Sequence, residues 1–392
     1  MKKIRIALIW KVLAACALGG LLGRVLPVPA IRVFTTFNYV FSQYIGFMVP
    51  LIIVGLVTPA ICKMGAGAGR MLVFTIALAY TCSVVAGMFS YGVTTNVFPM
   101  ILGEIKLDIG SSAADDVPPF FKIDIPAFFG VTSALVFSFL AGTLLTVTGN
   151  RYIKDFAFDF EDLVSRAIAK TLIPILPIYI FGIFLKMSHG GEMLPMIGVF
   201  AKIIVIIFAM SLIWLVIMFC ISGSLTRRNP FKCIAKMLPA YLTALATSSS
   251  AATIPVTVGC ARGCGVSEPV SKFSVPLCAT IHMPGSMMKI TACAIAIMML
   301  QDIPFSADLI LRFAMLLAIT AVAAPGVPGG VIMASLGVQA EVLGFGDANQ
   351  ALMITLYIVM DSFGTACNVM ADGAVAMIVE KVFGSYIDED DD

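Results

Sequence analysis

The sequence predicts an all-α polytopic membrane protein. At about 20 apolar residues per crossing, the chain has room for about eight to ten membrane segments. We expect these to be eight transmembrane helices and two re-entrant helical hairpins. The composition decides the class, because 60% of the 392 residues are hydrophobic and only 12% are charged. Soluble domains carry about 25% charged residues, and half that share cannot cover a surface that faces water. This excludes a soluble globular enzyme, a nucleic-acid-binding protein and a disordered chain.

Six ordinary spans come first along the chain. Each is an apolar stretch long enough to cross a bilayer. They lie at about 7–26, 37–62, 71–103, 126–148, 164–186 and 193–222. The first has the charged start of a signal peptide, but it ends in GRVLP rather than at a small-residue cleavage site, so we expect it to be a span.

Lysine and arginine residues gather in alternate connectors, and this sets the predicted orientation. The basic segments lie at 2–5, 63–70, 151–170 and 227–236. We expect these segments to be cytoplasmic, with the acidic connector 103–126 on the opposite side. Both termini then lie in the cytoplasm.

Two later apolar stretches are interrupted by residues that break helices. The segment TSSSAATIPVTVG at 247–259 lies within the stretch 233–260, and AAPGVPGGVIM at 323–333 lies within 307–343. Non-helical backbone persists at membrane depth only where it lines a cavity or is buried in protein. We therefore predict two re-entrant hairpins. Further spans follow at 271–300 and 350–383. The two hairpin-plus-helix units are inverted relative to each other, which indicates a secondary transporter.

The last span carries a stripe of polar residues. Asp361, Thr365, Asn368 and Asp372 are spaced 4, 3 and 4 residues apart, so they share one helix face. Two carboxylates on an apolar helix are costly unless cations or water accompany them. The stripe predicts a cation site, and the alternative is a structural polar seam between helices.

The span 271–300 should break at Met283-Pro284-Gly285, which would expose carbonyls able to ligate a hard cation. His282 adjoins the break, as a functional residue or as a hydrogen-bonded core histidine. Lys289 lies too centrally to reach the interface easily and is a candidate counter-charge, with snorkelling as its alternative.

The ten cysteines form no CxxC pair, and we expect them to be small buried residues rather than metal ligands. The sequence contains no phosphate-binding glycine loop outside the hairpins and no HExxH motif. An intramembrane hydrolase built on Ser249 or Ser250 would need a base such as His282 or Lys289, but nothing marks an oxyanion hole. We expect no enzyme activity and no cofactor apart from coupling ions.

Four motifs in this order resemble the dicarboxylate/amino acid:cation symporter family, which includes the glutamate transporters. They are SSSAATIP, ATIHMPGS, GVPGG and D-x-x-x-T-x-x-N-x-x-x-D. The form of the first hairpin resembles the bacterial serine/threonine:sodium branch. The resemblance implies a homotrimer in the cell (inner) membrane, with contacts to lipid and none to nucleic acid. It also implies a scaffold (1–70 and 126–190) and a moving transport domain (71–103 and 191–392).

The resemblance also implies roles for single residues. Asp361 would bind the α-ammonium of an amino acid and Asn368 its α-carboxylate. Further substrate contacts would come from Ser248, Ser249, Ser250, Ser286, Gly364 and Thr365, with Val327 in the lid. One sodium site would use Asp372 and Asn368 with backbone oxygens at Cys278 and His282. A second sodium site would use the carbonyls of Thr280, Ala321, Val322 and Ala324 beside Met283.

Three departures from the family pattern refine the prediction. Members that carry acidic substrates have an arginine where this chain has Gly364, so we expect a neutral substrate. His282, Pro284 and the pair Cys82-Ser83 replace residues that would ligate a third cation, so we expect that site to be lost. Lys289 is absent from the pattern, and we expect its ammonium to take over the electrostatic role of the missing ion.

The sequence therefore predicts sodium-coupled symport of a small neutral amino acid, of the serine, threonine or alanine type, by alternating access. His282 keeps proton coupling open. The alternative is a proton-coupled symporter of a small dicarboxylate or an acidic amino acid, and the intramembrane hydrolase is a remote third possibility.

Overall fold

The computed structural model describes residues 2–64, 70–102, 117–148, 150–189, 193–322 and 329–387, and these residues form no β-strand. The all-helical prediction is confirmed for this part of the chain. Helices dominate because the sequence consists of long apolar stretches, in which each backbone group must find its partner within the segment.

The N-terminal half contains long helices. They are α1 (Lys2–Leu22), α2 (Val28–Met64), α3 (Arg70–Leu102), α4 (Val131–Thr148), α5 (Arg151–Ala167), a π-helical turn (Ile168–Leu172), α6 (Ile173–His189) and α7 (Met193–Thr226). The segment α5 was expected to be part of a polar connector; it is helical and continuous with α6, since Arg151–His189 runs as one helix, and its role as a connector stays a prediction. The charges of α5 lie on one face, while Ala157 and Val164 are buried on the other.

The C-terminal half contains shorter helices that come in pairs. They are α8 (Pro230–Thr247), α9 (Ser250–Gly263), α10 (Glu268–Ile281), α11 (Pro284–Leu300), α12 (Ala307–Val322), α13 (Gly330–Leu343), α14 (Asp347–Val359) and α15 (Asp361–Ile387). The helices α8 and α9 pack against each other, and so do α12 and α13. Two helical hairpins therefore lie at the expected positions, and their insertion into a membrane stays a prediction.

Local sequence explains the first hairpin. Asn229 caps α8, Pro230 occupies its first turn, and Ser248 ends it in the left-handed conformation (φ 47°). Ser249 then caps α9 by accepting the Ala252 N–H at 3.2 Å. The serine-rich tip is thus a helix stop followed at once by a helix start. In the second hairpin, the expected tip residues Ala324 and Val327 lie outside the described residues.

Two of the long apolar segments are interrupted. The expected break after Ile281 is confirmed, since α10 ends there and α11 begins at Pro284. The expected continuous span 350–383 is wrong, because Met360 separates α14 from α15. The Met360 N–H bonds to the carbonyls of both Leu356 and Tyr357, so α14 ends in a tightened turn.

Six helices in the described residues are long and apolar enough to cross a membrane, and shorter apolar helices occur at Trp10–Leu22, Val136–Thr148 and Gly330–Leu343. The expected total of eight spans stays a prediction.

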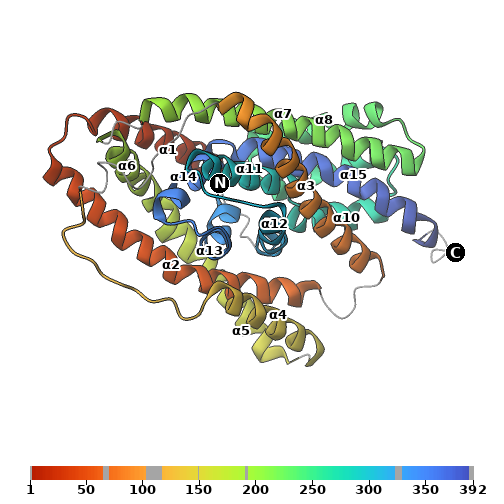
Figure 1. Cartoon of the computed structure of the whole chain (residues 1–392). Helices are drawn as coiled ribbons and strands as arrows, with labels where there is room; N and C mark the ends of the chain where they lie inside the picture. Colours follow the sequence, from red (N-terminus) through yellow and green to blue (C-terminus); the bar gives the residue numbers. More distant parts are fainter. Residues whose placement is uncertain are drawn as a thin grey trace.

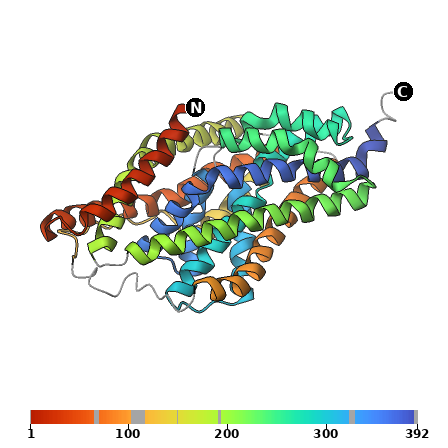
Figure 2. The same ribbon diagram turned by 90° about the horizontal axis from the view of Figure 1, so that it is seen from above.

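The helices pack in two groups (Figure 1). In one group α1 packs on α6, and α2 packs on α4, α5 and α6. In the other, α15 packs on α7, α8, α10 and α11, and α3 packs on α11 and α12. Figure 2 shows α15 lying lengthwise beside α7 and α8. Because neighbours surround it, every residue of α15 from Ala366 to Val379 is buried, and so is Asp361 at its start. The acidic residues Asp361 and Asp372 are thus both buried, whereas Glu380 is half-buried.

Candidate functional site

The helix break between α10 and α11 lies directly against α15. The side chain of Asn368 on α15 holds it there, because its Oδ1 accepts the Gly285 N–H at 2.7 Å and its Nδ2 donates to Ser286 Oγ at 3.3 Å. Gly285 permits this approach, since a Cβ there would lie 2.6 Å from the Gly364 carbonyl oxygen. Asn368 thus supplies both an acceptor and a donor to the first turn of α11.

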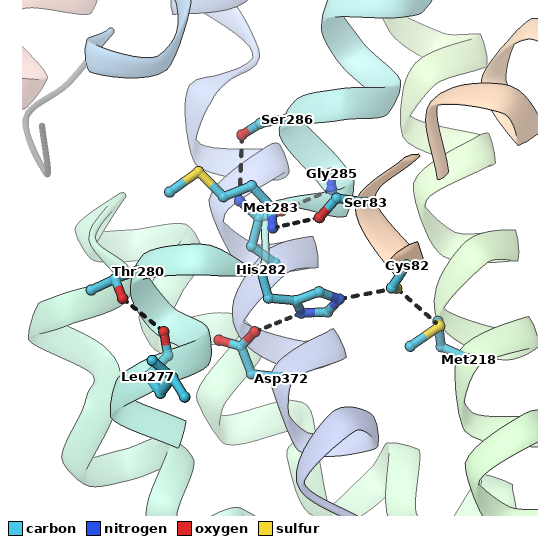
Figure 3. Close-up of polar contacts among 11 residues, drawn as sticks. Cys82, Ser83, Met218, Leu277, Thr280, His282, Met283, Gly285, Ser286 and Asp372 are labelled. Atoms are coloured by element: carbon cyan, nitrogen blue, oxygen red, sulfur yellow. Dashed lines mark hydrogen bonds and ion pairs between the residues drawn. The ribbon is translucent and has the colours of Figure 1, made fainter. Parts of the chain in front are cut away.

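A buried polar chain runs from α15 to α3 through the same break. His282 Nδ1 lies 2.8 Å from Asp372 Oδ1, and His282 Nε2 lies 3.0 Å from Cys82 Sγ (Figure 3). A carboxylate can only accept, so Nδ1 donates to Asp372. The Cys82 sulfur, which Nε2 faces, also lies 3.5 Å from Met218 Sδ. Next to this chain, the Met283 N–H donates to Ser83 Oγ at 3.3 Å. His282 therefore joins the two segments in which the sequence departs from the family's third-cation pattern, at 282–284 and 82–83, and links them to Asp372.

The second oxygen of Asp372 has a different environment. Asp372 is 1% exposed, and its Oδ2 is buried with no hydrogen-bond partner among the described residues. The Cys278 carbonyl, one turn before His282, accepts the His282 N–H at 2.9 Å and keeps a second lone pair. An unpartnered carboxylate oxygen suits a hard cation, because such cations take oxygen ligands. These residues fit sodium.

The second expected sodium set is only partly described. Its members Thr280 and Ala321 lie near the ends of α10 and α12, which contact each other. The Thr280 hydroxyl donates to the Leu277 carbonyl at 2.7 Å (Figure 3), so its side chain is used within α10. Val322 and Met283 are half-buried. The structure therefore brings part of this set to one region.

Asp361 has a cation beside it. Lys289 on α11 is 1% exposed, and its Nζ lies 3.7 Å from Asp361 Oδ1. The same ammonium donates to the Met360 carbonyl at 3.4 Å and lies 3.7 Å from the centre of the Tyr357 ring. Lys289 thus faces the α14–α15 junction rather than the residues of the missing third site, which His282 joins.

The tip of the first hairpin lies against the start of α15. Ser248 Oγ and Ser362 Oγ are 2.6 Å apart, and the Thr365 hydroxyl donates to the Asp361 carbonyl at 2.9 Å. Ser249 and Ser250 start α9 at the same tip and are half-buried. The tip therefore places hydroxyl groups next to the Asp361 end of the polar stripe.

The sequence interpretation missed Ser362 and Tyr357. Tyr357 also lies 3.3 Å from Ser286, through its hydroxyl group. A signal existed, because Tyr357 precedes Asp361 by one helical turn and Ser362 follows it directly. Both were treated as ordinary residues of an unbroken span.

A family model describing the sodium:dicarboxylate symporter family matches residues 8–382. The chain belongs to this family. The resemblance inferred from the four motifs is thereby confirmed, and with it the interpretation of the chain as a multi-pass membrane protein.

Similar proteins include amino acid transporters of this symporter family. Human excitatory amino acid transporter 3 is 31% identical over 172 residues, which are 42% of this chain and 32% of that protein. Human neutral amino acid transporter A is 26% identical over 288 residues, which are 73% of this chain and 47% of that protein. The chain thus spans less than half the length of these relatives.

For this symporter family member, the structure gathers most of the residues chosen from the sequence. Asp361, Gly364, Thr365, Asn368 and Asp372 all lie on α15. The expected α10–α11 residues and the serine tip approach the same helix. The site is thus built from the starts and breaks of short helices, where backbone groups are free to bind ions and substrates.

Proposed function

We propose that this chain is a sodium-coupled symporter that carries a small neutral amino acid across the cell membrane by alternating access. The observation that carries the proposal is the pair of buried carboxylates on α15, Asp361 and Asp372, which are 9% and 1% exposed. At membrane depth such groups require cations or donors beside them. A substrate ammonium at Asp361 and a sodium ion at Asp372 would supply those cations.

The surroundings of Gly364 support a neutral substrate. Gly364 has no side chain to receive a second substrate carboxylate, and the ammonium of Lys289, which lies against it, is already engaged with Asp361 and the Met360 carbonyl. A second substrate carboxylate would have to share that cation, and a buried charge without its own partner is costly. The name of neutral amino acid transporter A agrees with this specificity.

The remaining contacts suit the α-carboxylate and a small side chain. Asn368 Nδ2 has a second hydrogen beyond the one given to Ser286, and this hydrogen can be donated to a carboxylate. The hydroxyl groups of Ser248 and Thr365 lie next to the Asp361 turn and can bond a serine or threonine side chain. These assignments follow the residues expected from the sequence.

Coupling follows from the charges of the two sites. Asp361 already has the Lys289 ammonium beside it, whereas one oxygen of Asp372 is without a partner among the described residues. Until sodium binds, the Asp372 carboxylate therefore repels the carboxylate of the substrate. Bound sodium and bound substrate therefore raise each other's affinity by the same factor. The unpartnered Oδ2 of Asp372 is where we expect sodium to act.

We further propose that the two packing groups are a scaffold and a moving transport domain, in a homotrimer whose termini are cytoplasmic. Helix α14 packs on α11 and α13, within the expected transport domain. The hydrogen bond from Ser42 Oγ on α2 to Asp347 Oδ2 on α14, at 2.7 Å, therefore joins the two groups. It would break whenever the transport domain slides past the scaffold.

Uptake of labelled serine into proteoliposomes tests the proposal, with an inward sodium gradient and the same pH on both sides. We expect uptake that collapses when potassium replaces sodium. Unlabelled alanine, serine and threonine should compete, whereas aspartate should not. Asp361→Asn should abolish uptake, while Asp308→Asn, a change at an exposed residue of α12, should preserve it.

Other results would redirect the function. Uptake driven only by an inward proton gradient would move coupling to His282, which already bonds to Asp372. Competition by aspartate alone would refute the neutral specificity and favour a carrier of acidic amino acids or dicarboxylates.

A further inference from the structure

Lys289 is buried within the transport site rather than at its edge. It is 1% exposed, and its ammonium contacts the Asp361 carboxylate, the Met360 carbonyl and the Tyr357 ring. All three partners lie at the junction of α14 and α15, whereas Lys289 belongs to α11. Burying a lysine ammonium costs free energy, because the charge must be taken out of water, unless partners inside the protein compensate for that cost.

Gly364 makes room for this cation. A Cβ at Gly364 would lie 2.4 Å from Lys289 Cε and 2.5 Å from its Nζ, so no other residue fits while the lysine keeps this position. The end of the Lys289 side chain therefore occupies the volume that a side chain on α15 would fill. Lys289 and Gly364 act as one structural unit beside Asp361.

The Asp361 carboxylate needs another positively charged partner whenever the substrate leaves. The proposed function, on which this inference rests, gives Asp361 the ammonium of the substrate as its partner during the loaded crossing. The empty carrier must return through the same low-dielectric surroundings, and an uncompensated carboxylate would raise the barrier to that return. A cation tethered to the protein removes this barrier without waiting for a solute to bind.

We infer that Lys289 is this tethered cation: its ammonium neutralises Asp361 in the substrate-free carrier and so sustains the return of the empty site. The Lys289 ammonium lies 3.7 Å from one oxygen of Asp361, and a carboxylate has about four acceptor positions on its two oxygens, so the group can also accept a substrate ammonium. When the substrate binds, the Met360 carbonyl and the Tyr357 ring continue to hold Lys289. Lys289 is thus a positioning residue for charge and does not need to touch the substrate.

Two transport modes separate this role from a purely structural one. Exchange, with sodium and serine on both sides, needs only loaded crossings, in which the substrate ammonium pairs with Asp361 and the Asn368 amide binds the substrate carboxylate. Net uptake into liposomes without internal serine needs the empty return in every cycle. Lys289→Met should therefore slow net uptake by about tenfold or more, because it raises the activation barrier of the empty return. It should leave the rate of exchange within about twofold of that of the unmodified protein.

Variants and controls make the test decisive. Lys272→Met changes an exposed lysine on α10 and should leave both modes unchanged. If Lys289→Met does not assemble, Lys289→Gln removes the charge and keeps a donor for the Met360 carbonyl. Equal losses in exchange and net uptake, or no loss in either, would overturn the inference. If the unmodified protein exchanges a labelled dicarboxylate and not serine, the neutral specificity fails, and the same comparison of modes is made with that substrate.

Discussion

Asp372 provides a test of sodium binding that does not depend on transport. Its Oδ1 bonds to His282 at 2.8 Å, and its Oδ2 is buried without a hydrogen-bond partner. In Asp372→Asn, the amide oxygen can keep the bond to His282, and the NH₂ group then takes the place of Oδ2. This points hydrogen-bond donors at the position proposed for sodium, so the variant should lose sodium binding while keeping its fold.

The magnitude follows from these surroundings. Leaving a buried polar atom unsatisfied costs about 1–3 kcal/mol, and more when the group is charged. Without sodium, Asp372→Asn should therefore be at least as stable as the unmodified protein, because it removes a buried charge. With sodium at about 100 times its dissociation constant, the unmodified protein should gain about 2.7 kcal/mol. In a chain of 392 residues, that gain corresponds to a rise in Tm of about 3 °C.

The assay is thermal unfolding of the purified protein in detergent, with sodium or potassium chloride at the same ionic strength. We expect sodium to raise the Tm of the unmodified protein and to leave Asp372→Asn unchanged, so that their order of stability reverses between the two salts. Asp308→Asn, at an exposed site, should respond to sodium like the unmodified protein. An equal sodium response in Asp372→Asn, or none in the unmodified protein, would refute the reasoning.

Two further predictions concern the packing of the α11–α15 contact. Gly364→Ala should lower stability by about 1–3 kcal/mol and reduce net uptake, because the new methyl group displaces the buried ammonium. Gly259→Ala, where a Cβ meets open space on α9, should instead raise the Tm slightly, and thermal unfolding of both variants checks this. Asn368→Ala should cost about 1–3 kcal/mol, because the buried Gly285 N–H loses its acceptor. The exposed change Asn96→Ala is its control in the same unfolding assay, where equal Tm values would count against that role.

The breaks that the sequence predicted correctly have local causes. Pro284 cannot continue α10, because it lacks an N–H group, and the serine run at 248–250 offers side-chain caps at one point of an apolar stretch. Each of these signals lies within a few residues of the break it causes. The hairpin at 230–263 and the interruption at 282–283 could therefore be predicted from short segments alone.

The errors have causes that lie outside the local sequence. Nothing in the residues around Met360 requires a helix to stop, and the break coincides with the buried Lys289 of α11, which bonds to the Met360 carbonyl. The helix at 151–167 was expected only as a connector because of its charges, and these occupy one face of a continuous helix. The partner of Lys289 likewise depends on how α11 is rotated against α15, which the spacing of residues along one helix does not determine.

The two carboxylates of α15 differ in what the protein itself provides, and this difference suggests a division of labour. Asp361 has a cation on a neighbouring helix, so the protein supplies a full countercharge when no substrate is bound. Asp372 has a histidine on one oxygen and no partner on the other among the described residues, so a cation for the second oxygen must come from solution. On the empty return Asp361 is neutralised by Lys289, and Asp372 keeps only its bond to His282. The loaded crossing adds a sodium ion at the second oxygen of Asp372. The proposed transporter would then need sodium at Asp372 for coupling, while Lys289 makes a second exchangeable cation unnecessary at Asp361.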